Sequence, residues 1–166
     1  MEINLALLLL KQRELDADIN SRHNVTHEST KTERFLALLV EIGELANATR
    51  AFKYWSLKKS ESRDVLLDEF ADGLHFFLSI AIVFNFAVGK VEYESLPATK
   101  EEVNNAFKRV YLRITDLMRK ESKRCYIVAL KEFLSLGSAL EFSAQDITNA
   151  YNAKLVVNYD RQQHNY

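Results

Sequence analysis

The chain has 166 residues, of which 48% are hydrophobic and 27% charged, and its formal net charge is −1. This balance is that of a globular protein, and the absence of a Lys/Arg block excludes a general nucleic-acid-binding surface. One Pro and four Gly are too few for the turns of a sandwich or barrel, so helices are favoured. The length suits one core, and residues 1–166 are predicted to form a single domain.

The sequence indicates a soluble, cytoplasmic protein. Its one cysteine, Cys125, excludes an internal disulfide and fits a reducing compartment. The apolar run near the N-terminus is too short for a signal peptide, and no basic segment precedes it. The most apolar segment, residues 74–88, contains polar residues and is shorter than the roughly 20 residues of a membrane-spanning helix. We therefore expect no membrane partner.

Helical periodicity begins at the N-terminus. Residues 2–21 are predicted to form a first helix on an apolar stripe of Ile3, Leu7, Leu10, Leu15 and Ile19. Cap and turn formers in residues 22–30 predict a loop. The second helix should begin near Ser29 or Thr30, and its apolar stripe consists of Phe35, Leu38, Ile42 and Leu45.

The third helix should begin at Ser62, which is a candidate N-cap. It is predicted to run to about residue 87 and is apolar nearly all round in its second half, which is typical of a helix in the middle of a bundle. Residues 90–99 hold the only proline and predict a loop.

Three features complete the chain. A fourth helix is expected over residues 100–119 and a fifth over 122–136, with Gly137 as its C-cap. A capping-box-like pattern, Ser143 with Asp146, predicts the start of a final helix. The expected fold class is therefore all-α, an antiparallel bundle of about five to six main helices.

Two pairs of acidic residues, each with a spacing of three that is called an acidic step, are the candidate functional residues. They are Glu41 with Glu44 on the second helix, and Glu69 with Asp72 on the third. Residues three apart lie on one helix face, so each step projects two carboxylates to one side. Four carboxylates in a partly apolar site need a cation to neutralise them. Oxygen ligands favour Mg²⁺, with Mn²⁺ as a second candidate. The alternative, two solvated surface pairs, is weakened by the small apolar residues around the first step.

For the two acidic steps to meet between antiparallel helices, each must lie at a similar height from the connection. Glu69 lies about six residues, or roughly 9 Å, beyond the start of its helix. The second helix must therefore end or bend near residues 50–53. The aromatic block at residues 52–55, which includes Trp55, would then wall the site, although such residues also commonly pack a hinge or core.

One face of the last helix is predicted to carry two cations. Its residues recur at spacings of three and four: Tyr151, Lys154, Asn158 and Arg161. Arg binds phosphate through a planar fork and Lys as a point charge. Together with a metal site, such a face suggests phosphoanhydride chemistry, whereas the alternative is a solvated helix end. His75, three residues after Asp72, either supports the site or is a hydrogen-bonded core residue.

The combined pattern resembles the dimeric, all-α dUTPases, which belong to the all-α NTP pyrophosphatase superfamily together with MazG-like enzymes. The similar stretches are Gln12 with Leu15 and Asp16, and residues 37–56, 66–81 and 142–162. The resemblance implies a four-helix metal-binding core and a Mg²⁺-dependent homodimer that hydrolyses dUTP, and also dUDP, to dUMP.

Carried over by position, the resemblance implies a role for each candidate residue. The metal ligands would be Glu41, Glu44, Glu69 and Asp72. Glu44 would orient or deprotonate the attacking water, with Glu41 as the other candidate for this catalytic role. The phosphates would be held by Lys154, Asn158, Arg161 and Tyr166. The uracil base would contact the amide of Gln12 and stack on Trp55.

Two alternatives remain open at this point. One is a MazG-like or dCTP-preferring pyrophosphohydrolase, which would share the metal site. The other is a non-catalytic helical dimer whose acidic residues bind a structural ion.

Overall fold

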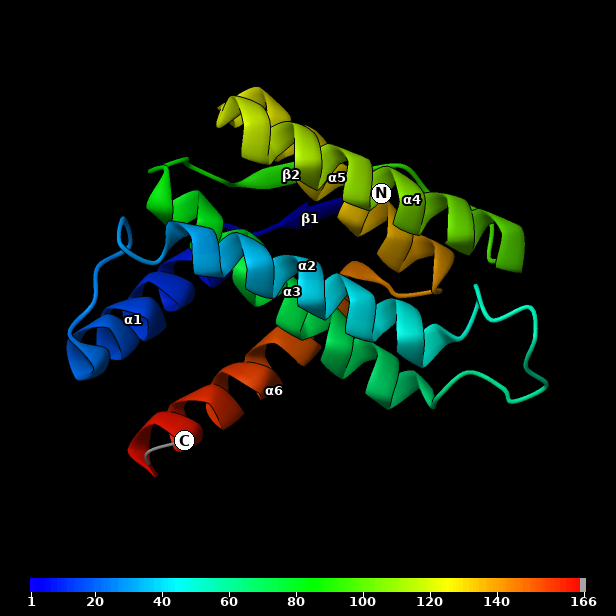
Figure 1. Cartoon of the computed structure of the whole chain (residues 1–166), viewed down its shortest axis with the longest axis horizontal. Coiled ribbons are helices and arrows are strands. Elements are labelled where there is room, and N and C mark those ends of the chain that lie inside the picture. The colour runs from blue at the N-terminus through cyan, green and yellow to red at the C-terminus, as the bar shows by residue number, and fades with distance from the viewer. Residues whose placement is uncertain (165–166) are drawn as a thin grey trace.

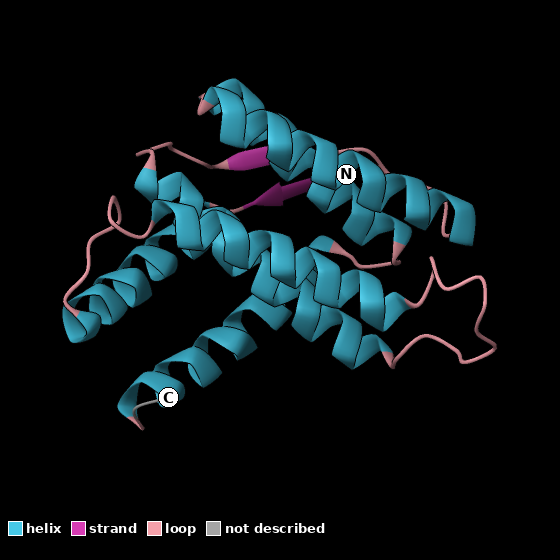
Figure 2. Ribbon diagram, viewed as in Figure 1, coloured by secondary structure: helices cyan, strands magenta, loops and turns pink. Residues whose placement is uncertain are grey.

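The computed structural model describes residues 1–164, and within them the chain is helical apart from one two-stranded sheet (Figures 1 and 2). The strands are β1 (Glu2–Asn4) and β2 (Lys90–Glu92). The helices are α1 (Ala6–His23), α2 (Lys31–Thr49), α3 (Arg63–Val83), α4 (Lys100–Lys120), α5 (Lys123–Ala139) and α6 (Ala144–Gln163). The predicted all-α fold class is confirmed.

Helix α3 occupies the middle of the bundle. It packs on α2, α6, α1 and α5, while α4 pairs with α5 and also contacts α2. Figure 1 shows the α4–α5 pair on one side of α2 and α3, with α1 and α6 on the other. Because α3 is covered from several directions, its second half is almost wholly buried, as its all-round apolar sequence predicts.

The two strands correct two predictions, one for the N-terminal residues and one for residues 90–99. Residues 2–4 are not part of the first helix, and part of the predicted 90–99 loop is a strand. The strands pair antiparallel with Ile3 opposite Val91, and each of these side chains is 3% exposed. Strands of three residues are too short to show an alternating pattern in the sequence.

The predicted apolar stripe of the first helix is only partly correct, since Ile3 and Leu15 are buried but Leu7 and Leu10 are not. Leu7 and Leu10 are 60% and 58% exposed. The face that is buried instead consists of Leu8, Leu9, Gln12, Leu15, Asp16 and Asn20. Because half of these residues are polar, apolar periodicity cannot mark this face. A buried face of this composition indicates a polar interior surface rather than a uniform core.

Several helix ends lie where the sequence predicts them. Thr30 and Ser62 precede α2 and α3, and the Ser62 hydroxyl accepts a hydrogen bond from the backbone N–H of Val65. Helix α2 ends at Thr49, and Arg50 follows in the left-handed conformation with a φ of 55°. The predicted end of α2 near residues 50–53 is therefore confirmed. Ser143 and Asp146 form the predicted capping box of α6.

Gly137 is not the C-cap of α5, which continues to Ala139. A Cβ at Gly137 would lie 2.8 Å from Cζ of Phe70 on α3, closer than carbon atoms can approach. The Phe70 ring stacks on Phe133 with 4.1 Å between ring centroids. This glycine therefore serves close packing between α3 and α5 rather than chain reversal.

We expect Gly137→Ala to lower the free energy of unfolding by about 1–3 kcal/mol, because the added methyl group overpacks the contact with Phe70. Urea denaturation measures the change. Gly89→Ala is the matched control, since a Cβ at Gly89 meets no atom within 4 Å. Equal effects of the two substitutions would contradict this packing role.

Candidate active site

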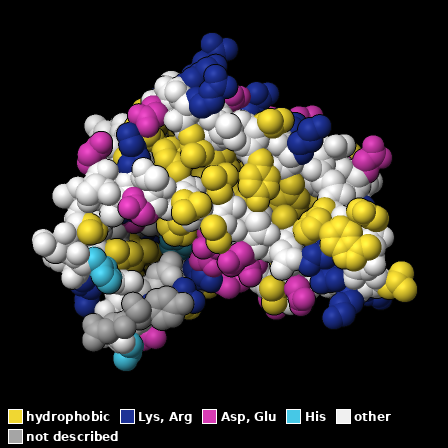
Figure 3. Space-filling model, in the orientation of Figure 1, with side chains coloured by type: hydrophobic (Ala, Val, Ile, Leu, Met, Phe, Trp, Pro, Cys, Tyr) yellow, Lys and Arg dark blue, Asp and Glu magenta, His cyan; other side chains and the backbone are white. Residues whose placement is uncertain are grey.

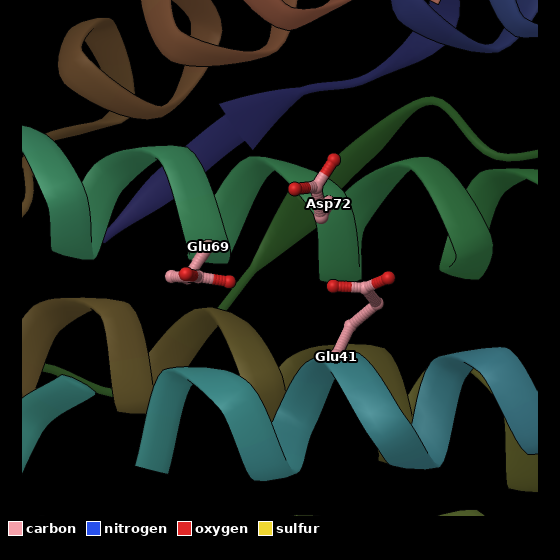
Figure 4. Close-up of side chains that lie close together, drawn as sticks. All are labelled: Glu41, Glu69 and Asp72. Carbon is pink, nitrogen blue, oxygen red and sulfur yellow. The ribbon is translucent and has the colours of Figure 1, made fainter. Parts of the chain in front are cut away.

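Three of the four predicted metal ligands converge between α2 and α3 (Figure 4). One oxygen from each of Glu41, Glu69 and Asp72 lies within 4.8 Å of the others. Glu41 projects from α2, and the other two residues project from α3. Glu44 lies outside this close group but lines the same cavity one turn further along α2. The antiparallel packing of α2 on α3 is what brings the two acidic steps together.

Burial makes the negative charge of this cluster unfavourable. It raises the pKa of Glu41 to about 7, and the Asp72 carboxylate adds to the effect. Burial also raises the pKa of Glu69 and that of Asp72, in each case against an opposing effect of a nearby lysine. A divalent cation would remove this penalty, and three carboxylate oxygens at this separation fit the hard-oxygen preference of Mg²⁺ or Mn²⁺.

The nearby lysine is Lys154 of α6, and its side chain is 5% exposed. Its Nζ donates a hydrogen bond to Asp68 at 2.7 Å and lies 2.6 Å from Oδ2 of Asp72. Burial would lower the pKa of Lys154, but its bonds to the two aspartates outweigh this effect and raise it overall. The positive charge of Lys154 thus partly neutralises the negative charge of the acidic cluster. A contact with phosphate remains a prediction.

A cavity of about 620 Å³ extends from the acidic cluster. Its walls come from α1, α2, α3 and α6 and from the loop between α1 and α2. Among the predicted site residues it is lined by Gln12, Glu41, Glu44, Asp72, Asn158 and Arg161. Figure 3 shows acidic side chains gathered near the centre of this face. Candidate metal ligands and candidate substrate contacts therefore surround one space.

Trp55 does not line this cavity. It is 65% exposed, and its ring packs edge-on against Phe52 and Tyr54 at centroid distances of 5.9 and 5.1 Å. The loop after α2 extends away from α1 and α6 (Figure 1), so the aromatic block does not wall the cavity within one chain. Tyr166 lies outside the described residues. Base stacking by Trp55 stays a prediction.

Sequence reasoning assigned no role to several polar residues of the cavity: Asp16, Asn20, Arg34 and Ser79. The signal that could have found them is spacing. Gln12, Asp16 and Asn20 recur every four residues on α1, which places three polar side chains on one face. These residues form the polar end of the cavity, away from the carboxylates.

His75 is a hydrogen-bonded core residue that also supports the site. Its Nδ1 lies 2.6 Å from Oε1 of Gln12, and its ring stacks on Tyr151 with centroids 4.0 Å apart. Burial lowers the pKa of His75 to about 4, so the ring is neutral at neutral pH. The contact of His75 with Gln12 orients the Gln12 amide. Both alternatives for His75, a core residue and a residue that supports the site, therefore apply.

The raised pKa of Glu41 predicts how the stability of the metal-free protein changes with pH. Because the folded state binds the Glu41 proton more tightly than the unfolded state does, this group favours folding at low pH, and the benefit is lost as pH rises through about 7. Allowing for partial exposure, the loss is about 1–2 kcal/mol. Thermal melting in EDTA from about pH 5 to about pH 8 measures it.

Glu41→Gln should flatten this dependence, since glutamine does not titrate. Added Mg²⁺ should oppose the loss at the upper end of the range, because it binds the ionised carboxylates. An unchanged slope in the variant would show that Glu41 is not the titrating group.

Comparison with known families agrees with this geometry. The model of a family described as dUTPase matches residues 4–166, almost the whole chain. No curated protein matches the chain. The dUTPase family is all-α, as is this fold, and its members generally depend on a metal ion, for which the acidic cluster offers ligands. Among the described residues, no helix is both long and apolar enough to cross a membrane. The chain therefore belongs to the dUTPase family and is an enzyme of the dUTP diphosphatase class, a hydrolase that acts on a deoxyuridine nucleotide.

Proposed function

We propose that the protein is a Mg²⁺-dependent pyrophosphohydrolase that converts dUTP to dUMP and pyrophosphate and also accepts dUDP. The observation that carries this proposal is a single cavity with a carboxylate cluster in one part and a buried polar pocket in another. The first suits a metal with phosphates, and the second suits a nucleobase. Mn²⁺ fits the same ligands.

The close carboxylates of Glu41, Glu69 and Asp72 would hold the ion, and bound Mg²⁺ would supply positive charge against the phosphate oxygens. Asn158 and Arg161 line the cavity from α6 and would donate hydrogen bonds to those oxygens. Lys154 would keep Asp72 ionised and so preserve its affinity for the ion.

Glu44 is the stronger candidate for orienting or deprotonating the attacking water. Glu44 lines the cavity but lies outside the group of three close carboxylates, so its carboxylate need not coordinate the ion. Glu41, inside that group, would serve mainly as a ligand. Comparison of Glu44→Gln with Glu41→Gln tests this division. Both should lose turnover, but only the second should lose metal affinity, measured by calorimetry.

A panel of deoxynucleoside triphosphates with Mg²⁺ tests the proposed function directly. Release of dUMP and pyrophosphate from dUTP is the expected result, with loss of turnover in EDTA. Equal turnover of all substrates would favour a MazG-like activity, and preference for dCTP would contradict the uracil assignment. Absence of any turnover would leave the structural-ion alternative. dUDP is assayed in the same series.

We also propose a homodimer, for which the outer face of α2 and α4 offers support. Large apolar side chains are exposed there, including Leu36 and Val40 on α2 and Leu112 on α4. Figure 3 shows hydrophobic side chains gathered over this region of the surface. Leu36→Glu combined with Val40→Glu should convert a dimer to a monomer in light scattering. A wild-type monomer would contradict the proposal. The predicted cytoplasmic location stays a prediction.

A further inference from the structure

Asp68 of α3 lies beside the carboxylate cluster but is not part of it. Among the described residues, the carboxylates with oxygens within 4.8 Å of one another are those of Glu41, Glu69 and Asp72. The side chain of Asp68 is 58% exposed, and its Oδ2 accepts a hydrogen bond from Nζ of Lys154 at 2.7 Å. An exposed aspartate therefore holds a lysine that is itself almost wholly buried.

Lys154 is shared between two aspartates. Asp68 and Asp72 are four residues apart on α3, so their carboxylates project from the same face of the helix. Lys154 reaches them from α6, which packs on α3. Its Nζ lies 2.6 Å from Oδ2 of Asp72 and 2.7 Å from Oδ2 of Asp68. One ammonium group thus joins a candidate metal ligand to a carboxylate outside the cluster.

The buried ammonium group of Lys154 needs a negative partner. An unpaired charge that is removed from water carries a large desolvation cost. Within the described part of the chain, Lys154 forms ion pairs with Asp68 and Asp72 and with no other carboxylate. In the metal-free protein, both aspartates neutralise its charge.

A metal ion at the cluster would change this arrangement. Asp72 is one of the three candidate ligands, and it faces the space between α2 and α3 together with Glu69 and Glu41 (Figure 4). The ion and Lys154 would compete for the carboxylate of Asp72, and their positive charges would repel each other at short range. The affinity for the ion therefore depends on whether another carboxylate holds Lys154.

We propose that Asp68 is a positioning residue that holds Lys154 and neutralises its charge when a divalent cation is bound at Asp72. Asp68 contacts neither the ion nor the substrate. Its carboxylate lets a buried ammonium group and a dication lie side by side, and so raises the affinity of the cluster for Mg²⁺ or Mn²⁺. This inference rests on the proposed function, because it takes the ion to bind at the carboxylate cluster.

Two simpler effects of Asp68 can be distinguished from this role. Any carboxylate near the cluster attracts a cation through its charge, and this effect does not need Lys154. An ion pair between α3 and α6 can also stabilise the fold, and this effect does not change the affinity for the ion. A role that acts through Lys154 requires both residues to be present.

The test is Asp68→Asn, with the affinity for Mg²⁺ measured by calorimetry. Asparagine keeps the shape of the side chain and can still accept a hydrogen bond from Lys154, but it carries no charge. The dissociation constant of Mg²⁺ should rise about tenfold, as is common when a residue that supports a metal ligand is changed. Asp68→Glu keeps the charge and should restore most of the affinity.

Asp64→Asn is the matched control. Asp64 also lies on α3, two helical turns, or roughly 11 Å, before Asp72, and it forms no ion pair among the described residues. The substitution changes the net charge by the same amount as Asp68→Asn. Because exposed charges at this distance are largely screened in about 0.1 M salt, the control should keep the wild-type affinity for Mg²⁺.

Lys154→Met shows whether Asp68 acts through the lysine. Without Lys154, no ammonium group competes for Asp72, so adding Asp68→Asn should have little further effect on the affinity for Mg²⁺. An equal loss of affinity with and without Lys154 would show that Asp68 acts directly through its charge, and would overturn the proposed role. Thermal melting in EDTA checks that Asp68→Asn is folded. Asp68→Ala, which also removes the hydrogen bond, should lower the affinity at least as much.

The outcomes separate the inference from the proposed function. An unchanged affinity for Mg²⁺ in folded Asp68→Asn overturns the role of Asp68 even when dUTP is hydrolysed. Binding of Mg²⁺ without turnover of dUTP overturns the proposed function, while a loss of affinity in Asp68→Asn that depends on Lys154 would still support the inference. Absence of Mg²⁺ binding in wild type overturns both.

Discussion

Replacing Glu69 with glutamine should reduce dUTP turnover by about 100-fold or more while leaving the fold intact. Glutamine has nearly the same shape as glutamate but removes one negative charge from the group formed with Glu41 and Asp72. The variant should therefore bind Mg²⁺ more weakly, and calorimetry with the ion measures this loss independently of turnover.

The same change should not destabilise the metal-free protein. Burial, and then repulsion from Glu44 and Asp72, raises the pKa of Glu69, so its ionised form is unfavourable in the folded state. Removing that charge should leave the melting temperature in EDTA equal or higher. Asp116→Asn is the control for loss of a charge, since Asp116 lies on α4 and pairs only with exposed Arg113 among the interactions described. Full turnover in Glu69→Gln would refute the carboxylate cluster as the metal site.

Replacing Lys154 with methionine should lower the free energy of unfolding by about 2–3 kcal/mol at neutral pH. Methionine keeps most of the apolar stem but leaves Asp72 without its closest positive neighbour. Because Asp72 is largely buried, its unpaired charge carries a desolvation cost that solvent only partly relieves. Chemical denaturation in EDTA measures the change without a contribution from the ion.

Lys90→Met is the matched control. Lys90 also pairs with a carboxylate, that of Glu2, but both side chains are exposed, and such pairs contribute at most about 1 kcal/mol. Combining Lys154→Met with Asp72→Asn should restore part of the lost stability, because the buried charge is then gone. If Lys154→Met and Lys90→Met have equal effects, Lys154 does not balance the cluster.

The sequence predicted α2 and the carboxylates well, for a physical reason. The stripe of Phe35, Leu38, Ile42 and Leu45 is wholly buried, and its apolar spacing is a local signal that packing preserves. The acid-x-x-acid pairs could be recognised in the sequence because the two acids of each pair are three residues apart, within one turn of a helix. The end of α2 near Arg50 was predicted because the acidic pairs of two antiparallel helices can meet only if they lie at similar distances from the connection between the helices.

The same reasoning failed for α1. Leu7 and Leu10 suggested the wrong face, since the true inner face alternates apolar residues with Gln12, Asp16 and Asn20. A helix that lines a polar cavity buries hydrogen-bonding groups as well as apolar ones, so hydrophobic periodicity underestimates it. The short β1–β2 pairing was missed because its partners are far apart in the chain.

By itself, the sequence determined that the fold is all-α and that two acid-x-x-acid pairs could meet, because helix periodicity and residue spacing are local properties. Only the tertiary structure decided which charges and hydrogen bonds share a site. Lys154, whose contact with phosphate stays a prediction, lies against Asp72. Arg34 of α2 donates a hydrogen bond to Asp16 of α1. Such partners depend on the angle and register of helices packed together, and no local pattern in the chain encodes them.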